Sequence, residues 1–333
     1  MEQLTHMKLP SIRSSVRAVR EMKPMARREM YTGLLFIAPW LFGFLAFTLL
    51  PMLATLFFTF IDARITDNLA SPKFVGFQNY VTLLNDSAVW NARPNSTPGA
   101  FWVTLRFGLI ALPVGILLPL AIATLMNSKH LKGQAFFRSM FYMPYIIPMV
   151  AAVFLWNGVL NPETGWINRI LESFGIPRTS VPGWANDVNW VYPAYVIIGV
   201  WGIGNAMLTM LGSMQAVPTD LYDAAKVDGA GPFMSFMNVT FPMISPVIFY
   251  NLVLSVVGLF QFFLVPLVIN QGTGEPGGAT MFYNLLLYKT FFGNFNLSYG
   301  STLAWTLFVI ILVATVILFY TARYWVYYAS ERN

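Results

Sequence analysis

The chain contains no cysteine and only two histidines, His6 and His130, among its 333 residues. These absences exclude a disulfide framework, and they leave a Cys/His metal site or a redox centre without ligands. Charge is also scarce, because charged residues make up 10% of the chain and hydrophobic residues 56%. Soluble domains carry roughly 25% charged residues. The composition therefore excludes a disordered chain and a soluble nucleic-acid-binding domain, and it predicts a protein embedded in a lipid bilayer.

The sequence also lacks an energy source of its own. No GxxxxGK[ST] phosphate loop is present, and the GxGxxG pattern at Gly272, Gly274 and Gly277 contains Pro276 and falls in a predicted outer loop, which indicates a turn. The predicted spans hold no Asp, Glu or His of the kind that relays protons. Their polar residues are neutral: Asn157, Asn205, Asn251 and Gln261. A proton-coupled or other secondary transporter is thereby disfavoured, and a membrane-embedded enzyme would need clustered histidines or carboxylates that the chain lacks.

Long charge-free runs are what the sequence does contain. A helix needs about 20 apolar residues to cross the hydrocarbon core. Six runs reach that length: Met30–Ile61, Phe107–Ser128, Ser139–Pro162, Val188–Thr219, Gly229–Gly274 and Thr290–Ala322. The first run is too long for a cleaved signal peptide. We therefore predict an all-α integral membrane protein with six transmembrane helices.

Lysine and arginine set the predicted orientation, since they concentrate on the cytoplasmic side of membrane proteins. With both termini inside, the inner segments hold thirteen basic residues and the outer loops six, and seven of the thirteen lie within the first 30 residues. We predict a basic cytoplasmic tail (1–30), a transmembrane domain (31–328) and a cytoplasmic C-terminus (329–333). The tail is interpreted either as a solvated topology signal or as a helix lying on membrane lipid.

The inner loop between the fourth and fifth runs, Val217–Pro242, breaks the apolar pattern. Pro218 suits the first position of a helix, acidic residues follow in its first turns, and Gly229 can adopt the left-handed conformation that ends it. Pro232 can open a second short helix, and Pro242 marks the approach to the next span. We predict a helix-turn-helix on the inner membrane surface.

At these residues the chain resembles the permease subunits of binding-protein-dependent ABC importers. Their hallmark loop reads E-A-A, three residues, G, nine residues, I-x-L-P; this chain has Asp223, Ala224, Ala225, Gly229 and Val239-Thr240-Phe241-Pro242 at the same spacing. Aspartate replaces glutamate, which shortens the reach of the carboxylate. The string LYDAAKVDGAG, with FVGFQNYVTLL, FFRSMFYMP and NPETGWINRIL elsewhere, narrows the resemblance to carbohydrate-uptake permeases of the maltose and glycerol-phosphate type.

The resemblance implies a type I importer (MetI-like) fold in a prokaryotic inner membrane and no catalysis by this chain. Asp223, Ala224, Ala225, Gly229 and Pro242 would form the coupling loop that docks on an ATPase dimer, and that partner would bind ATP and magnesium. A second homologous permease and an extracytoplasmic substrate-binding protein would complete the complex, because the outer loops are too short to form a binding domain.

Sugars are held by neutral hydrogen-bonding groups and aromatic faces. Trp201 and Asn205, four residues apart, and Phe260 with Gln261 offer such groups and resemble pathway positions of maltose-type permeases. Tryptophan also anchors helices at the interface, and Asn or Gln also bonds neighbouring helices. A sugar or oligosaccharide is the predicted cargo, with glycerol phosphate or a polyol as the alternative.

Overall fold

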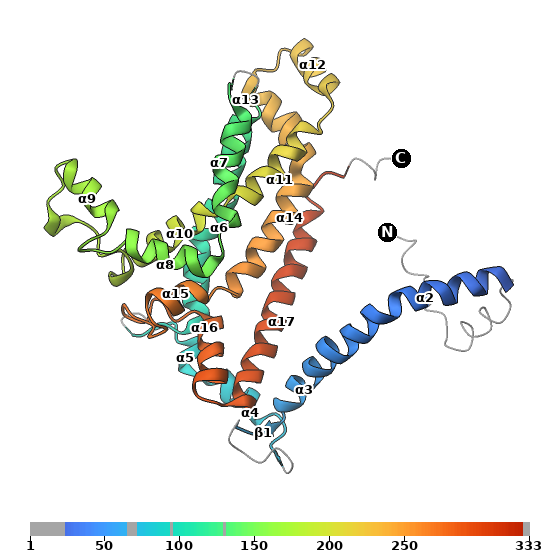
Figure 1. The fold of residues 1–333 in the computed structure, drawn as a ribbon, viewed down its shortest axis with the longest axis vertical. Coiled ribbons are helices and arrows are strands. Elements are labelled where there is room, and N and C mark those ends of the chain that lie inside the picture. The colour runs from blue at the N-terminus through green and yellow to red at the C-terminus, as the bar shows by residue number, and fades with distance from the viewer. Residues whose placement is uncertain (1–23, 65–71, 94–95, 129–130, 329–333) are drawn as a thin grey trace. The chain divides into compact units, whose positions relative to one another are not determined.

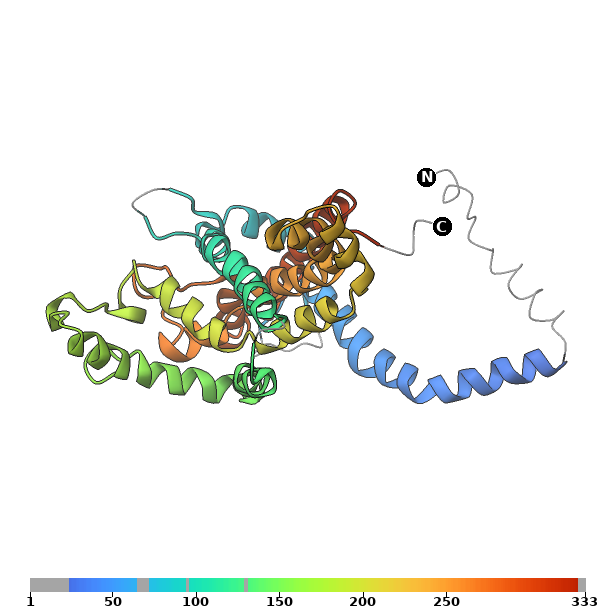
Figure 2. The ribbon, with the colours of Figure 1, turned by 90° about the horizontal axis from the view of Figure 1, so that it is seen from above.

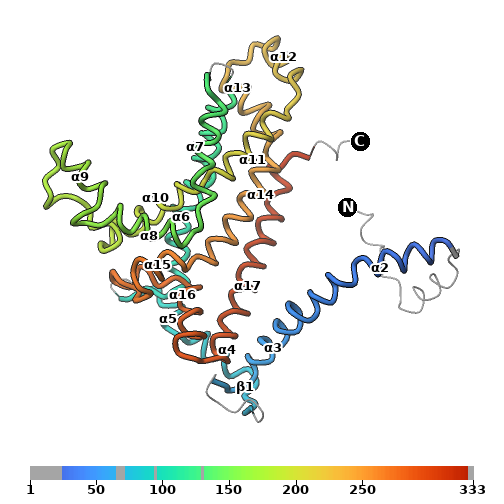
Figure 3. Tube along the Cα trace, in the orientation of Figure 1, coloured from blue at the N-terminus to red at the C-terminus, as the bar shows by residue number. Residues whose placement is uncertain are grey.

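The computed structural model describes residues 24–64, 72–93, 96–128 and 131–328, and its secondary structure is almost entirely helical. The chain divides into two compact units, one ending at Phe57 and the other beginning at Phe58. The basic tail that we predicted lies mostly outside the described residues, and the short C-terminus lies wholly outside them. Figure 1 labels the elements, and Figure 3 traces the path of the chain.

The first unit is one long helical run, formed by α2 (Pro24–Phe44), η1 (Leu45–Leu49) and most of α3 (Leu50–Phe58). Proline suits the first turn of a helix, where a backbone N–H would have no partner. The π-helical turn η1 ends two residues before Pro51, which cannot donate a backbone hydrogen bond. Met25–Phe58 counts 34 residues, about 51 Å at 1.5 Å per residue, which is enough to cross a bilayer.

The second unit begins with a small layer of short elements on the side that we predict to face the outside of the membrane. Strands β1 (Ile61–Asp62) and β2 (Lys73–Phe74) pair antiparallel, with Ile61 opposite Phe74. Two short helices follow, α4 (Gln78–Leu84) and α5 (Ser87–Trp90). The Asn79 side-chain amide donates to the carbonyls of Thr59 and Ile61, at 3.0 Å each, and so ties α4 to the start of this layer.

Together with this first run, the helices of the second unit confirm the six predicted spans. Three further helical runs are long and apolar enough to cross a membrane: α6 (Ala100–Met126), Pro232–Ile269, and α17 (Leu297–Ala322). The second of these comprises α13 (Pro232–Ser235), η4 (Phe236–Thr240), α14 (Phe241–Phe260) and α15 (Leu264–Ile269). Two bent pairs bring the count to six if each pair is one span: α7 (Gln134–Ile146) with α8 (Met149–Val159), and α10 (Val191–Trp201) with α11 (Gly204–Gln215).

The bends have local causes. The first pair turns by 100° at Ile147, whose ψ of 130° is the extended conformation expected before a proline, here Pro148. The second pair turns by 54° between Trp201 and Gly204. A Cβ atom on Gly204 would lie 2.3 Å from the Phe141 carbonyl oxygen, so glycine is what allows α11 to approach the main chain of α7.

The ends of the second unit differ in character. The hairpin that contains α12 (Thr219–Val227) lies at one end, and α4 and β1 lie at the opposite end (Figure 1). An arm of α8 and α9 (Trp166–Ser173) projects sideways from the other helices in both views (Figure 1 and Figure 2). The remaining connections hold η2 (Arg178–Ser180), η3 (Trp184–Asn186), α16 (Tyr283–Tyr288) and η5 (Lys289–Gly293).

Helix α6 is central to the packing of the second unit, because α10, α11, α14, α16 and α5 all contact it. One buried cluster joins α6, α11 and α14 towards the hairpin end and contains Met207, Met210, Met214 and Ile244. A second cluster towards the opposite end contains Phe107, Tyr195 and Phe282. These contacts hold the spans that connect the two ends.

Candidate functional site

The hairpin predicted from Val217–Pro242 is present as two short helices. Helix α12 follows Pro218, carries Asp220 in its first turn and Lys226 in its last, and so places each charge at the end of the helix dipole that favours it. Helix α13 begins at Pro232. The local sequence signals therefore located the start of α13 at Pro232, and that of α12 to within one residue, since Pro218 is the residue before the helix.

Gly229 ends α12 in a complete Schellman motif. Its φ of +80° is left-handed, its N–H donates to the Lys226 carbonyl at 3.0 Å, and the next N–H, of Ala230, donates to the Ala225 carbonyl at 2.9 Å. A Cβ atom at Gly229 would meet nothing within 4 Å. Space for a side chain is available, so it is the left-handed backbone conformation that requires glycine here.

One face of the hairpin is anchored and the other is exposed. Tyr222, Phe236 and Val239 pack against the buried cluster of α6, α11 and α14, and the Tyr222 hydroxyl is hydrogen-bonded to the Thr240 hydroxyl at 2.9 Å. On the outward side, Val227 is 89% exposed and Phe233 79% exposed. Large exposed apolar side chains beside polar ones are typical of a docking surface.

Asp223 and Ala224 lie on the exposed side, and Ala225 is half-buried. The Asp223 carboxylate accepts a hydrogen bond from Lys226 Nζ at 2.7 Å, an ion pair one turn apart. Both side chains are more than two-thirds exposed, so solvent screens this pair and it contributes little to stability. The pair holds the carboxylate on the surface of the hairpin.

Pro242 lies at the start of α14, directly after the π-helical turn η4. Its carbonyl accepts from the Ser245 hydroxyl at 2.7 Å, and that hydroxyl oxygen accepts from the Tyr327 N–H at 2.9 Å. A pocket of about 240 Å³ lies beside it, lined by Leu221, Val239, Pro242 and Tyr327 among others. The hairpin is thus joined to α14 and to the chain that follows α17.

A second cavity, here named the inner pocket, lies between α6, α10 and α14. Its volume is about 220 Å³, and it is lined mainly by apolar side chains and glycines, with Tyr195 and Ser255 as polar groups. Cβ atoms on Gly115, Gly199 and Gly258 would meet nothing within 4 Å. Small residues on three facing helices thus keep this space open. That pattern is a signal that sequence reasoning missed.

The four predicted pathway residues lie near this pocket without lining it. Trp201 is half-buried against Trp156, with ring centroids 5.9 Å apart, and Asn205 is exposed near the start of α11. The bend between them removes the continuous helix on which the same-face argument rested, so that argument is wrong. Phe260 is 5% exposed and packs in the cluster of α14, α16 and α17. Gln261 is exposed. Their contact with a substrate stays a prediction.

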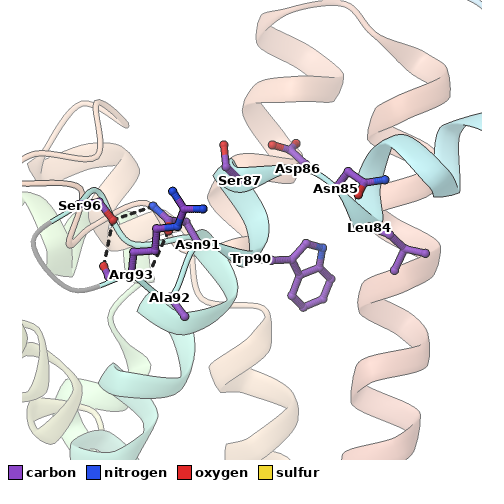
Figure 4. Close-up of a pocket in the computed structure, with 9 residues that line it drawn as sticks. All are labelled: Leu84, Asn85, Asp86, Ser87, Trp90, Asn91, Ala92, Arg93 and Ser96. Atoms are coloured by element: carbon purple, nitrogen blue, oxygen red, sulfur yellow. Dashed lines mark hydrogen bonds between the residues drawn. The ribbon is translucent and has the colours of Figure 1, made fainter.

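A third cavity, the outer pocket, lies beside α4 and α5 and measures about 600 Å³. Figure 4 shows the Trp90 ring on one side and Asn91, Arg93 and Ser96 grouped on the other. Asp86 accepts from the Ala88 N–H at 2.8 Å and from the Tyr299 hydroxyl, so its carboxylate is held in place. Burial, and to a lesser degree the Asp86 charge, raises the pKa of the Tyr283 hydroxyl above its ordinary value.

The outer loops are tied to the spans by Asn270. Its side chain accepts from the Tyr195 hydroxyl of α10 and donates to the Ala185 and Glu275 carbonyls, at 2.9 Å each. Lys289 Nζ donates to the Gly272 carbonyl at 2.6 Å. Across the described ranges, no group of three or more His, Cys, Asp or Glu residues could hold a metal ion.

Comparisons with known proteins agree with this geometry. A family model described as "binding-protein-dependent transport system inner membrane component" matches residues 98–333. The probable ABC transporter permease protein YesP of Bacillus subtilis (strain 168) is 33% identical over 309 residues, which cover 92% of this chain and 95% of that protein. The lactose transport system permease protein LacF of Rhizobium radiobacter is 29% identical over 293 residues, covering 87% and 94%.

A solved structure shows the same fold. A chain of a bacterial alginate ABC transporter, crystallised in complex with an alginate pentasaccharide-bound periplasmic protein, superposes with a TM-score of 0.73 at 20% identity. The superposition covers 89% of this chain and 95% of that chain.

Proposed function

Because this chain belongs to the family of inner-membrane components of binding-protein-dependent transport systems, we propose that it forms half of the pathway by which an ATP-driven importer takes up a sugar or oligosaccharide. The family is a non-catalytic, multi-pass membrane component, which disfavours the secondary-transporter alternative. The lactose permease among the relatives supports a sugar over glycerol phosphate or a polyol. We place the chain in a prokaryotic plasma membrane.

The complete importer contains, in this proposal, a second homologous permease, a dimer of ATPase subunits that bind ATP and magnesium, and an extracytoplasmic binding protein. The hairpin supports this arrangement, because its exposed face combines the Asp223–Lys226 pair with Val227 and Phe233. Ala224 and Ala225 allow close approach of the ATPase, and Gly229 shapes the turn. An ion pair across such an interface would add specificity as well as affinity.

The observation that carries the proposal is the continuous connection from the hairpin to the inner pocket. Tyr222 bonds Thr240 of η4, and η4 continues directly into α14 at Phe241. Helix α14 then lines the inner pocket through Ser255 and Gly258. A displacement imposed on the hairpin by ATPase closure would therefore move a wall of the pocket. Alternating access requires such a coupling of two sites through one element that both can bias.

The test is to purify the tagged chain from its native membrane with its partners and to reconstitute the complex in nanodiscs. We expect ATP hydrolysis that rises when binding protein loaded with sugar is added. Replacing Asp223 and Gly229 together, by Ala and Val, should release the ATPase while the chain stays in the membrane. Sugar-driven flux or ATP hydrolysis by the chain without partners would contradict the proposal.

A further inference from the structure

Helix α6 carries a charged side chain inside its span. Arg106 lies six residues after Ala100, about 9 Å along the helix axis at 1.5 Å per residue. From α6 onward, the candidate spans contain one other charged residue, Arg138 of α7. Arg138 lies near the predicted cytoplasmic end of its span, where the distribution of positive charge in membrane proteins explains it. Arg106 lies towards the outer end, where that rule disfavours it.

The charge of Arg106 is not neutralised by the part of the chain that the structure describes. Its side chain is exposed, and no described carboxylate forms an ion pair with it. Charged side chains at membrane depth are costly, and they usually mark a substrate or ion pathway. An arginine at this depth without an ion-pair partner among the described residues therefore points to an anion that comes from outside this chain.

The surroundings of Arg106 place it beside the proposed pathway. It is followed directly by Phe107, which packs against Tyr192 of α10 with ring centroids 5.8 Å apart. Phe107 and Tyr195, one turn along α10 from Tyr192, both line the inner pocket. Arg106 thus lies next to the residue through which α6 contacts both Tyr192 and that pocket.

The outward direction along the same face of α6 leads to the outer pocket. Trp102 lies one turn before Arg106, and its indole N–H donates to the Trp90 carbonyl at 3.1 Å. Trp90 lines the outer pocket. Along α6, Arg106 therefore lies between the two cavities.

We propose that Arg106 binds the carboxylate of an acidic oligosaccharide as the cargo passes from the outer to the inner pocket. This inference rests on the proposed function and names the class of sugar. A guanidinium binds a carboxylate through two parallel hydrogen bonds, and the nearby Tyr192 ring offers a face for the sugar. The inner pocket adds small and neutral groups, which suits the uncharged remainder of the sugar.

The experiment uses the complete transporter in nanodiscs with its binding protein. The probes are uronate trisaccharides based on glucuronate, galacturonate and mannuronate, and their methyl esters, which differ from them only in charge. We compare wild type with Arg106→Gln, Arg106→Lys and the control Lys73→Gln, which removes an exposed positive charge from β2. The readouts are the binding of each sugar to the binding protein, the stimulation of ATP hydrolysis, and copurification of the second permease.

We expect an acidic trisaccharide to stimulate the wild type. Arg106→Gln should raise its half-saturating concentration about tenfold or more, as expected for loss of a charge-assisted hydrogen bond. The half-saturating concentration of Arg106→Lys should fall between those of wild type and Arg106→Gln, and that of Lys73→Gln should match wild type. Any methyl ester that stimulates ATP hydrolysis should do so with the same half-saturating concentration in all variants.

Four results would overturn the inference. Stimulation by neutral sugars alone, or an unchanged response of Arg106→Gln to the acidic sugar, contradicts it and leaves the proposed function intact. Loss of the second permease from Arg106→Gln would instead assign the arginine to an acidic residue of that partner. Failure of every sugar to stimulate ATP hydrolysis would contradict the proposed function and this inference together.

Discussion

The left-handed turn at Gly229 allows a direct test of coupling. Forcing an L-residue into that conformation costs roughly 1–2 kcal/mol, and Gly229 has φ +80° with open space around its missing side chain. The docked hairpin requires this turn, so Gly229→Val should weaken ATPase docking by about 5- to 30-fold, the factor that 1–2 kcal/mol represents. The span and its packing should be unaffected, because the hairpin is exposed at this position.

Two further variants separate conformation from steric contact. Gly231 lies two residues away, has φ −70° and ψ 174°, and also has nothing within 4 Å, so Gly231→Ala is a matched control that should behave as wild type. Asn tolerates the left-handed region better than other non-glycine residues. Gly229→Asn should therefore retain more coupling than Gly229→Val, although its side chain is of similar size.

The assay measures ATP hydrolysis by the reconstituted complex while the ATPase is titrated onto the permease in nanodiscs. An apparent affinity that falls in the order wild type, Gly229→Asn, Gly229→Val would support the conformational argument. Wild-type titration by Gly229→Val would refute it. Equal defects in Gly229→Asn, Gly229→Val and Gly231→Ala would show that bulk at the interface matters and the turn does not.

Four other substitutions test the pathway and the packing. Asn205→Ala and Gln261→Ala should each lose one hydrogen bond to sugar, about 0.5–1.5 kcal/mol, and raise the concentration for half-maximal uptake about 2- to 10-fold; wild-type curves for both would remove them from the site. Gly258→Val should narrow the inner pocket without disturbing the fold, so uptake of a trisaccharide should fall more than that of a monosaccharide. Gly204→Ala should destabilise the chain by about 1–3 kcal/mol because its Cβ would overlap a carbonyl oxygen of α7. Thermal unfolding checks this last prediction, and Gly212→Ala, which has open space in the same helix, should not lower the melting temperature.

The spans and the hairpin could be predicted because local chemistry determines them. Charge-free runs give spans since charge is costly in hydrocarbon, and the hairpin follows from proline and glycine at its ends. Reading from charge to charge started the second span at Phe107, whereas α6 begins at Ala100 and includes Arg106. That charge lies within a helix because the packing of α6 against its neighbours, rather than hydropathy alone, determines where the helix begins.

The pathway residues were harder to predict because they depend on how helices face one another. An unbroken apolar run cannot reveal a 100° bend between α7 and α8, although Pro148 marks its position. Phe260 and Gln261 are neighbours in sequence, yet Phe260 is buried and Gln261 is exposed. Which side of α14 faces the inner pocket follows from its contacts with α6, α11 and α17, and these contacts are not visible in one sequence.

The π-helical turn η4 sets the angular phase between the docking hairpin and α14. A π-turn contains one more residue than the α-helical turn it replaces, and successive residues of an α-helix are rotated by about 100° around its axis. Deleting one residue within Phe236–Thr240 would restore an α-helical ladder and turn the preceding hairpin by about that angle. Phe233 and Asp223 would then face a different direction, with every side chain of the hairpin still present. The five-residue length of η4 thus fixes the rotation of the docking hairpin relative to α14, and with it the alignment of the ATPase side and the cargo side of the protein.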